Sequence, residues 1–551
     1  MARIVLITPA RRFIANRFGL GYQVPLGLVY IGGPLVDAGH TVRLIDNDVY
    51  GWSLKRLVRE VIDFKADYAL VGHTGSTAAH AVAIATISAI RADAPWVRTI
   101  YGGVYPSYAD KPTLNECPAI DVIVRGEGEK TIIELIDVWE RYFARRRGGS
   151  PFENSESGST METRSYDYEN SDSYSACTGG SPFENSDSGS TMETRPYDLT
   201  GIPGITWRNG DKIIANPSRP AIQNLDSYRP GFELVDWPRY KLFGFGPAAG
   251  LQFSRGCPLT CSYCGQWMFW KKWRHRSPEV LVAQMTELSE KYGVKFIWFA
   301  DENFSADRET VKRVFELICA ANLNISLNLN MTAADVVRDA DLLPLYKAAG
   351  VDYIVMGVES LEDSVVAGVR KNNPYAISKE AVRLLRENNI ISLTNIIYGL
   401  EQESWATLWA KFRKLLEFDS DILNACYITP HFWTSDGKAT RPDDIIQLDM
   451  SKWTYRNQVV ATPTLTPPAL FVGVKLTEAF FHLRPKALLR LISHPDARYR
   501  KIMRHSFWVG IKVVLAEIAE FLFETKFAPR GAMDHIPGSV VKETELPVLQ
   551  M

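Results

Sequence analysis

The sequence lacks most features that would place it outside the ordinary globular enzymes. Its formal net charge is −1 and 23% of its residues are charged, so no global basic field favours nucleic acid. Its seven cysteines form no disulfide framework, and no secretory signal begins at Met1. No apolar run is long enough to span a bilayer. These absences predict a reduced, cytoplasmic protein without a transmembrane segment or a nucleic-acid partner.

One apolar stretch, residues 508–523, comes nearest to a membrane segment. Charged residues interrupt it at helical spacing, which is typical of an amphipathic helix. We expect this helix to pack on the protein rather than lie on a membrane, and a peripheral membrane contact stays open.

Three cysteines lie close together, at Cys257, Cys261 and Cys264. This C-x3-C-x2-C spacing supplies three thiolates, and a four-iron cluster would keep one iron open for a small molecule. Zinc sites usually use two C-x2-C pairs, and thioredoxin-like sites use a single pair. An iron–sulfur cluster is therefore favoured over a structural zinc or a buried cysteine cluster.

The first 140 residues alternate apolar strands with helical patterns. The strand candidates are residues 4–7, 42–45, 68–71, 99–101 and 122–124. This alternation predicts a parallel doubly wound sheet, in which ligands bind at the carboxyl ends of the strands. Residues 72–75 and the pair Gly102-Gly103 follow two of these strands, where glycine lets a large ligand approach the backbone.

A polar tandem repeat interrupts the chain after this region. Residues 149–167 recur at 180–198 and are rich in Ser, Glu, Asp and Thr. A segment of this composition cannot bury enough apolar surface to order itself, so we predict a disordered insertion without a catalytic role.

A second alternating region follows a predicted hairpin at residues 205–213. Its six strand candidates are residues 250–254, 296–300, 325–331, 353–358, 391–398 and 422–429. Six βα units predict an incomplete version of the eight-fold barrel, with the cysteines on the loop after the first strand. From about residue 446 the pattern is helical.

The predicted fold class is therefore α/β, with five segments. They are a doubly wound, flavodoxin-like domain over residues 1–145, a disordered insertion over 146–200, a hairpin linker over 201–245, a partial six-stranded (β/α)6 barrel over 246–445, and a helical carboxyl-terminal region over 446–551.

The cysteine spacing and the six βα units resemble the radical SAM (S-adenosylmethionine) superfamily over residues 246–440. The resemblance implies a [4Fe–4S] cluster on the three cysteines, with SAM on the open iron. The SAM contacts that it implies are Tyr263, Asp301, Glu302, Glu359 and Ser360. Asp301 and Glu302 are equally plausible as helix N-caps, whereas Glu359 lies within a longer Gly-Val-Glu-Ser match.

The amino-terminal region resembles the cobalamin-binding domain of one large radical SAM class, through residues 25–28, 39–42, 46, 102–103 and 125–129. The implied cobalamin contacts are Thr74, Gly75, Gly102, Gly103, Gly126 and Glu127. No Asp-x-His-x-x-Gly motif supplies a lower cobalt ligand, and a lone histidine such as His73 or His80 is more often structural. The absence of G-x-G-x-x-G disfavours a nucleotide.

Tryptophans and cations alternate just after the cysteines. Trp267, Trp270 and Trp273 recur at every third position, so on a helix they would form a stripe beside lysines and arginines. Aromatic faces suit a flat macrocycle and cations suit its carboxylates. Packing of the helix against the barrel explains the same pattern equally well.

This segment, residues 427–434 and residues 527–531 together resemble the anaerobic magnesium-protoporphyrin IX monomethyl ester oxidative cyclases of bacteriochlorophyll biosynthesis. The resemblance implies closure of the isocyclic ring to give protochlorophyllide, with SAM-derived radical chemistry and oxygen taken from water. It also implies a magnesium-porphyrin substrate and a reducing electron donor. The substrate contacts that it implies are Trp270, Lys272, Trp273, Arg274 and His431.

Two alternatives remain open at this point. A cobalamin-dependent radical SAM methyltransferase would share both domains and the same cysteines. A non-catalytic carrier of cobalamin or porphyrin would not need an iron with an open position.

Overall fold

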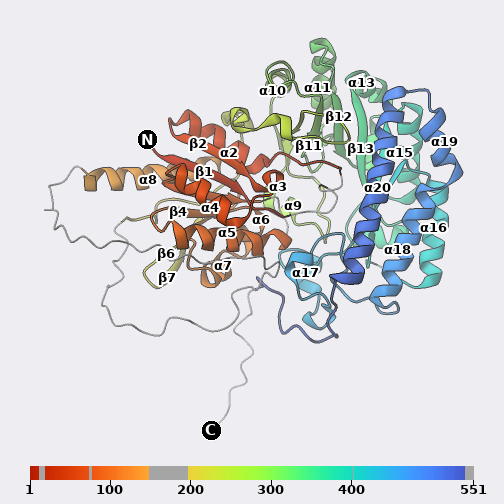
Figure 1. The fold of residues 1–551 in the computed structure, drawn as a ribbon. Coiled ribbons are helices and arrows are strands. Elements are labelled where there is room, and N and C mark those ends of the chain that lie inside the picture. The colour runs from red at the N-terminus through yellow and green to blue at the C-terminus, as the bar shows by residue number, and fades with distance from the viewer. Residues whose placement is uncertain (12–15, 17–18, 74–76, 148–196, 401, 540–551) are drawn as a thin grey trace, which may run out of the picture.

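The computed structural model describes residues 1–11, 16, 19–73, 77–147, 197–400 and 402–539 (Figure 1). Two α/β domains and a layer of carboxyl-terminal helices make up the described chain. The tandem repeat that the sequence predicts to be disordered falls almost wholly on residues 148–196, outside the described residues.

The first domain contains a seven-stranded sheet with the strand order β2-β1-β3-β4-β5-β6-β7. Its strands are β1 (Arg3–Thr8), β2 (Thr41–Asp46), β3 (Tyr68–Gly72), β4 (Arg98–Gly102), β5 (Val122–Val124), β6 (Ile205–Asn209) and β7 (Lys212–Ala215). The first five are parallel, in the order typical of flavodoxin-like folds. The doubly wound prediction is confirmed.

Helices cover both faces of this sheet. Successive side chains of a strand point to opposite faces, and because the buried strands carry apolar side chains on both faces, both faces need to be covered. The helices are α2 (Leu26–Asp37), α3 (Asn47–Tyr50), α4 (Leu54–Asp63), α5 (His80–Asp93), α6 (Val104–Tyr108), α7 (Asp110–Glu116) and α8 (Glu129–Arg147). In β1, Ile4 and Leu6 pack in one core with α2 and α8. Val5 and Ile7 pack in the opposite core with α4, α5 and α7.

The hairpin predicted as a linker belongs to this sheet. Its strands β6 and β7 turn at Gly210, which has a φ of +58°, and β6 pairs antiparallel with β5. Ile205 and Trp207 are fully buried in the core that α8 covers. The hairpin therefore extends the first domain beyond residue 145.

The second domain is a parallel sheet of six strands, as the sequence predicts, and its strand order is β15-β14-β13-β12-β11-β8. Its strands are β8 (Ala248–Leu251), β11 (Phe296–Phe299), β12 (Ser326–Met331), β13 (Val351–Glu359), β14 (Ile391–Tyr398) and β15 (Ile422–Tyr427). Its helices are α10 (Pro278–Glu290), α11 (Arg308–Ala321), α12 (Ala333–Arg338), α13 (Leu343–Ala348), α14 (Asp363–Gly368), α15 (Tyr375–Glu387), α16 (Trp405–Phe418) and α17 (Ser435–Ala439).

The first strand of this sheet ends earlier than predicted, at Leu251. The Asp301 carboxylate accepts hydrogen bonds from the backbone N–H groups of Phe253 and Ser254 and from the Ser254 hydroxyl. These bonds take the place of ladder bonds to the neighbouring strand. Two short antiparallel strands, β9 (Ser254–Arg255) and β10 (Arg274–His275), then frame the segment that carries the cysteines and α9 (Gln266–Trp270).

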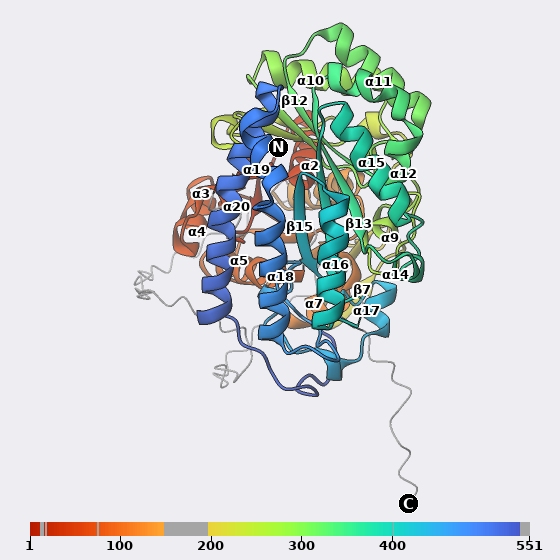
Figure 2. The same cartoon turned by 90° about the vertical axis from the view of Figure 1, so that its right-hand side faces the viewer.

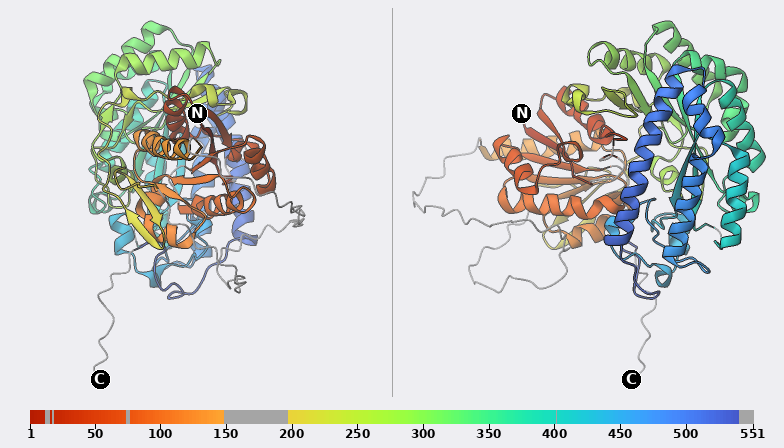
Figure 3. Two further views of the ribbon diagram at one scale, coloured as in Figure 1. Left: turned by 90° about the vertical axis from the view of Figure 1, so that its left-hand side faces the viewer. Right: turned by 45° about the vertical axis from the view of Figure 1, so that its right-hand side comes forward.

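Three carboxyl-terminal helices, α18 (Pro467–His482), α19 (Pro485–Ser493) and α20 (Ala497–Phe523), lie against the barrel (Figure 2). Helix α20 runs along the border between the two domains (Figure 3), where Val509 packs against Leu20. Its inner side also buries Val513 and Glu517, so this side packs on the protein as predicted. Among the described residues, no helix combines the length and the apolar composition needed to cross a bilayer.

Candidate active site

The cysteine loop follows β9 and is anchored on both sides. The Trp267 indole donates to the Cys261 carbonyl oxygen over 3.1 Å, and the Ser262 hydroxyl donates to Asp436 over 2.9 Å. Gly256 has a φ of +95°, and a Cβ there would lie 2.6 Å from the Lys272 carbonyl oxygen. Only glycine therefore fits where the chain enters the loop.

The three thiols suit a metal cluster. Cys261 is buried and the other two cysteines are partly buried, and burial raises the pKa of Cys257 to about 11 and of Cys264 to about 12. A coordinating metal deprotonates such thiols outright. No three potential ligand side chains of the described residues converge as they would around a single metal ion. A four-iron cluster does not require that convergence, because each cysteine ligates a different iron.

A buried ion pair lies beside the cysteines. Glu359 ends β13 with a φ of +66°, and its carboxylate accepts a hydrogen bond from Lys371 Nζ at 2.5 Å. Burial lowers the pKa of Lys371, but Glu359, Cys261 and Cys264 raise it overall. A left-handed conformation at a non-glycine strand end is costly and is typical of functional sites.

The predicted SAM contact Tyr263 joins this pair. Burial raises the pKa of its phenol, and its hydrogen bond to Glu359 raises the pKa further. Ser360, the residue after Glu359, accepts a hydrogen bond from the Glu362 N–H over 3.0 Å near the start of α14. The fold thus brings Tyr263, Glu359 and Ser360 to one side of the loop, and their contacts with SAM stay predictions.

The two acidic residues after β11 differ in their surroundings. Asp301 is buried with its carboxylate on Phe253 and Ser254, so it shapes the backbone that precedes the cysteines. Glu302 accepts a hydrogen bond from Trp270 and adds to the raised pKa values of Cys257 and Cys264, while burial raises its own pKa to about 7. Of the two, Glu302 is the one whose charge acts on the pKa values of Cys257 and Cys264.

The glycines predicted to contact cobalamin lie at the carboxyl edge of the first sheet. Gly103 has a φ of +127° and Gly126 has a φ of +73°. The Ser107 hydroxyl joins their loops, because it donates to the Gly103 carbonyl over 2.6 Å and accepts from the Gly126 N–H over 3.0 Å. Gly102 ends β4 beside them, and Thr74 and Gly75 lie outside the described residues.

Both histidines weighed as cobalt ligands have other partners. His73 Nε2 lies 2.7 Å from the Tyr101 hydroxyl, and His80 Nδ1 lies 3.2 Å from the same oxygen. His80 Nε2 also contacts Glu116. These bonds support the structural interpretation of both histidines.

Glu127, a predicted cobalamin contact, lies in a buried ionic network between the two domains. It accepts from Arg255 Nη1 over 2.9 Å, from Arg274 Nη1 over 3.0 Å and from the Ile222 N–H over 2.6 Å. Glu129 binds the other side of the Arg255 guanidinium. We call these four side chains, Glu127, Glu129, Arg255 and Arg274, the interdomain clamp. The contacts of Glu127 with cobalamin and of Arg274 with the substrate stay predictions, and in the structure these two side chains bind one another.

The predicted helical stripe of tryptophans is wrong. Helix α9 ends at Trp270 because Lys271 adopts a φ of +63°, so Trp273 lies beyond the helix. The Trp273 indole donates to the Asn303 carbonyl over 3.1 Å and its ring packs on the core. Trp270 is partly exposed, with the Arg255 guanidinium 5.1 Å from its ring, and Lys272 is exposed.

Aromatic side chains join the cysteine loop to the first domain. The ring of Tyr108, at the end of α6, stacks on Trp433 with centroids 5.3 Å apart, and Cys264 adds to the rise that burial causes in the pKa of Tyr108. A Cβ at Gly265 would lie 2.1 Å from Trp433 Nε1, so the loop touches the indole directly. The His431 ring stacks on Trp433, with ring centroids 4.7 Å apart. Phe269 of α9 lies beside Tyr108, with ring centroids 6.5 Å apart. We call Tyr108, Phe269, His431 and Trp433 the aromatic junction.

His431, the fifth predicted substrate contact, also links the domains. Its Nδ1 lies 2.9 Å from the Thr77 hydroxyl of the first domain, and burial lowers its pKa to about 4. The imidazole is therefore neutral near neutral pH.

Sequence reasoning missed Lys371, Tyr108 and Trp433. Trp433 lies inside residues 427–434, which the sequence singles out, but this motif does not say which of its side chains faces the cysteine loop. Lys371 comes twelve positions after Glu359 and carries no local signal.

Comparison with known proteins supports the assignment of both domains. Residues 251–415 match the Radical SAM superfamily and residues 19–136 match the B12 binding domain. An anaerobic magnesium-protoporphyrin IX monomethyl ester cyclase of Synechocystis sp. is 33% identical over 547 residues, which is 99% of each chain. The enzyme of the same name from Cereibacter sphaeroides is 28% identical over 85% of this chain and 68% of its own.

A solved structure has the same fold. The radical S-adenosylmethionine methyltransferase TsrM from Kitasatospora setae superposes with a TM-score of 0.64 at 14% identity, over 94% of this chain and 100% of its own. This fold and the three-cysteine loop define a cobalamin-binding radical SAM enzyme, whose cofactors are a [4Fe–4S] cluster, SAM and cobalamin. Similarity to the Synechocystis protein over nearly the whole chain then shows that the chain belongs to the family of anaerobic magnesium-protoporphyrin IX monomethyl ester cyclases.

Replacing Gly103 with Val is expected to lower cobalamin occupancy while the iron content stays unchanged. A side chain at a φ of +127° is strained, and its Cβ would lie 3.2 Å from the His73 carbonyl oxygen at the ligand edge of the sheet. Cobalamin absorbance and iron per chain after reconstitution measure both. Gly39→Val is the matched control, because Gly39 also has a positive φ but lies away from this edge, between α2 and β2. Equal cobalamin loss in both variants would contradict the assignment.

Proposed function

We propose that this chain closes the isocyclic ring of magnesium-protoporphyrin IX 13-monomethyl ester without oxygen, giving protochlorophyllide with a keto oxygen derived from water. Identity of 33% with a cyclase over 99% of both chains carries the proposal. The step needs a hydrogen abstracted from an unactivated C–H bond of the esterified propionate side chain.

The cofactors supply that reactivity: a reduced cluster with SAM at its open iron is a source of the 5′-deoxyadenosyl radical, which is strong enough for this abstraction. The residues of the chain hold the cofactors and orient the substrate. In the proposal, Cys257, Cys261 and Cys264 hold three irons. Tyr263 and the Glu359–Lys371 pair border the open iron, where a carboxylate and an ammonium can bind the two charged ends of a methionyl group.

The porphyrin in this proposal lies against the aromatic junction, between the cysteine loop and the cobalamin-binding domain. Support comes from the stacking of Tyr108 on Trp433 and from the proximity of Tyr108 to Cys264. Flat aromatic faces suit the macrocycle. Trp270 and Lys272 are the proposed porphyrin contacts at the loop, and the neutral His431 is a third.

The methyltransferase alternative would use the same cofactors and is distinguished by its product. The test is an anaerobic incubation of the reconstituted chain with a chemical reductant, SAM and the magnesium porphyrin ester. We expect a ring-closed product by mass spectrometry, with label from H2¹⁸O in the keto group. A methylated porphyrin would establish the alternative, and no conversion with no SAM cleavage would favour a carrier. A reducing protein partner is the physiological counterpart of the reductant.

Changing Lys272 to Gln is expected to weaken porphyrin binding by about 1–3 kcal/mol while SAM cleavage survives. The expected loss is that of one charge-assisted contact with a free propionate. Its backbone carbonyl packs against Gly256, so the side chain starts beside the cysteine loop. Fluorescence titration of the porphyrin measures the affinity. The control is Lys291→Gln, which changes an exposed lysine directly after α10. Unchanged affinity in Lys272→Gln would remove this contact from the proposal.

A further inference from the structure

The carboxyl-terminal helices form one continuous surface layer. Helices α16, α18 and α20 run side by side (Figure 2), and α19 leads directly into α20. Phe412 of α16 packs against Phe480 of α18, with ring centroids 6.3 Å apart. Phe471 of α18 stacks on Phe521 of α20 at 4.0 Å. We call the solvent side of this layer the outer helical face.

Helix α18 exposes apolar residues and buries charged ones, which is the reverse of an ordinary surface helix. Its exposed residues recur at every fourth position and are all apolar: Pro468, Val472, Leu476 and Phe480. An ordinary helix at the surface of a globular protein turns its polar residues to water.

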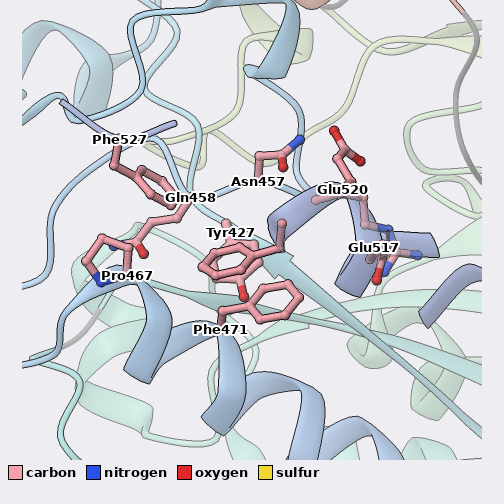
Figure 4. A pocket seen from close by; sticks show the side chains of 10 residues that line it. Tyr427, Asn457, Gln458, Pro467, Phe471, Glu517, Glu520 and Phe527 are labelled. Atoms are coloured by element: carbon pink, nitrogen blue, oxygen red, sulfur yellow. Dashed lines mark ion pairs between the residues drawn. The ribbon is translucent and has the colours of Figure 1, made fainter. Parts of the chain in front are cut away.

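The charges of α18 point inward instead. Lys475 Nζ lies 2.5 Å from Glu478 of the same helix and 2.6 Å from Glu517 of α20. Glu517 borders a small internal cavity together with Tyr427 and Phe471 (Figure 4), and Arg456 lies 3.4 Å from its carboxylate. Charged side chains inside and apolar side chains outside fit a helix whose outer surroundings are not water.

The neighbouring helices extend the apolar area. Between 37% and 82% of each of these side chains is exposed: Trp405, Trp409 and Leu416 on α16, Leu489 and Ile492 on α19, Trp508, Ile511, Leu515, Leu522 and Phe523 on α20, and Leu483 between α18 and α19. The spacing of Trp508, Ile511 and Leu515 puts them on one side of α20. Exposed patches of more than a few hundred Å² are rare on monomers and mark interaction surfaces.

One end of the outer helical face is strongly basic. Exposed cations on α19 and on the first half of α20 border the apolar area: Lys486, Lys501, Arg504 and Lys512. The acidic residue between these two helices, Asp496, is already paired with Lys347 at 3.0 Å. The partner must therefore offer an apolar phase next to negative charge.

We propose that the outer helical face docks on the surface of an anionic lipid bilayer. The apolar stripes enter the boundary of the acyl chains, the tryptophans occupy the headgroup level, and the basic end binds anionic headgroups. A second copy of the chain is a poorer occupant, because it would bring the same four cations, whereas the exposed carboxylates Glu417 and Glu524 lie away from the basic end, on α16 and after the last turn of α20.

Flotation of the full chain with lipid vesicles tests the proposal. We expect binding to vesicles of phosphatidylcholine with phosphatidylglycerol, weaker binding to phosphatidylcholine alone, and loss of the difference at high salt. The double variant Leu476→Ser/Phe480→Ser should bind about tenfold or more weakly. Lys501→Gln/Arg504→Gln should lose only the preference for the anionic vesicles. Trp96→Ser, which removes an exposed tryptophan from the first domain, is the matched control and should bind normally.

Iron content shows that each variant is folded. Failure of the parent chain to float with either vesicle overturns the proposal, as does unchanged binding by Leu476→Ser/Phe480→Ser. Sedimentation velocity tests whether a second copy of the chain covers the face instead. If the parent chain is a dimer that does not bind vesicles, and the double variant is a monomer, the face is assigned to a second copy. None of these outcomes depends on which porphyrin the enzyme converts.

Discussion

Replacing Cys261 with Ala is expected to abolish the iron–sulfur cluster and the cleavage of SAM together. Cys261 supplies one of only three thiols on the loop, and its position is fixed by the Trp267 indole and the Ser262 backbone. Two thiols cannot hold a four-iron cluster with a single open iron. Iron per chain and anaerobic formation of 5′-deoxyadenosine measure the two losses. Cys257→Ala and Cys264→Ala should behave in the same way.

Cys319→Ala is the matched control for this series. Cys319 is a partly buried cysteine on α11 that packs against the barrel core, so its loss should cost some stability but no iron. Full iron content and deoxyadenosine formation in Cys261→Ala would contradict the assignment of the loop, whatever the substrate turns out to be.

Most strands of both sheets could be predicted because they are short segments rich in apolar residues between helical patterns. In β1 the consecutive residues Ile4 and Val5 belong to opposite cores. The partner of an edge strand could not be predicted in this way. The hairpin of β6 and β7 has a readable turn at Gly210, but nothing local shows that β5 is its neighbour. The end of β8 could not be predicted either, because it depends on Asp301, which is 48 residues from Phe253.

The site could be predicted where its residues are neighbours in the sequence. The three cysteines and Tyr263 share one loop, so their spacing carries the chemistry. Pairs that the fold brings together carry no such signal: Glu127 and Arg274 are 147 positions apart. Each looked functional by itself, since one lies at a strand end and the other in a basic segment. Their mutual neutralisation is visible only in three dimensions.

Glu127→Ala is expected to lower the free energy of unfolding by about 3–5 kcal/mol, the cost of removing one partner from a buried ion pair. The change removes the carboxylate that both Arg255 and Arg274 bind. Both arginine side chains are buried, since neither is more than 8% exposed. Denaturant unfolding of the cofactor-free chain measures the loss. Glu380→Ala, which breaks an exposed pair with Arg383, is the control and should leave stability unchanged.

The same variant separates a clamp from a cobalamin contact. Arg255 directly precedes Gly256 and Cys257, so a broken clamp should also loosen the cysteine loop and alter the electron paramagnetic resonance spectrum of the reduced cluster. Glu127→Gln keeps an acceptor for the Ile222 N–H and should lose less stability than Glu127→Ala. A cobalamin contact predicts the opposite pattern, in which stability and the cluster spectrum are unchanged and only cobalamin occupancy falls. That pattern would support the cobalamin contact of Glu127 and would leave Glu129 and Gln252 to hold Arg255.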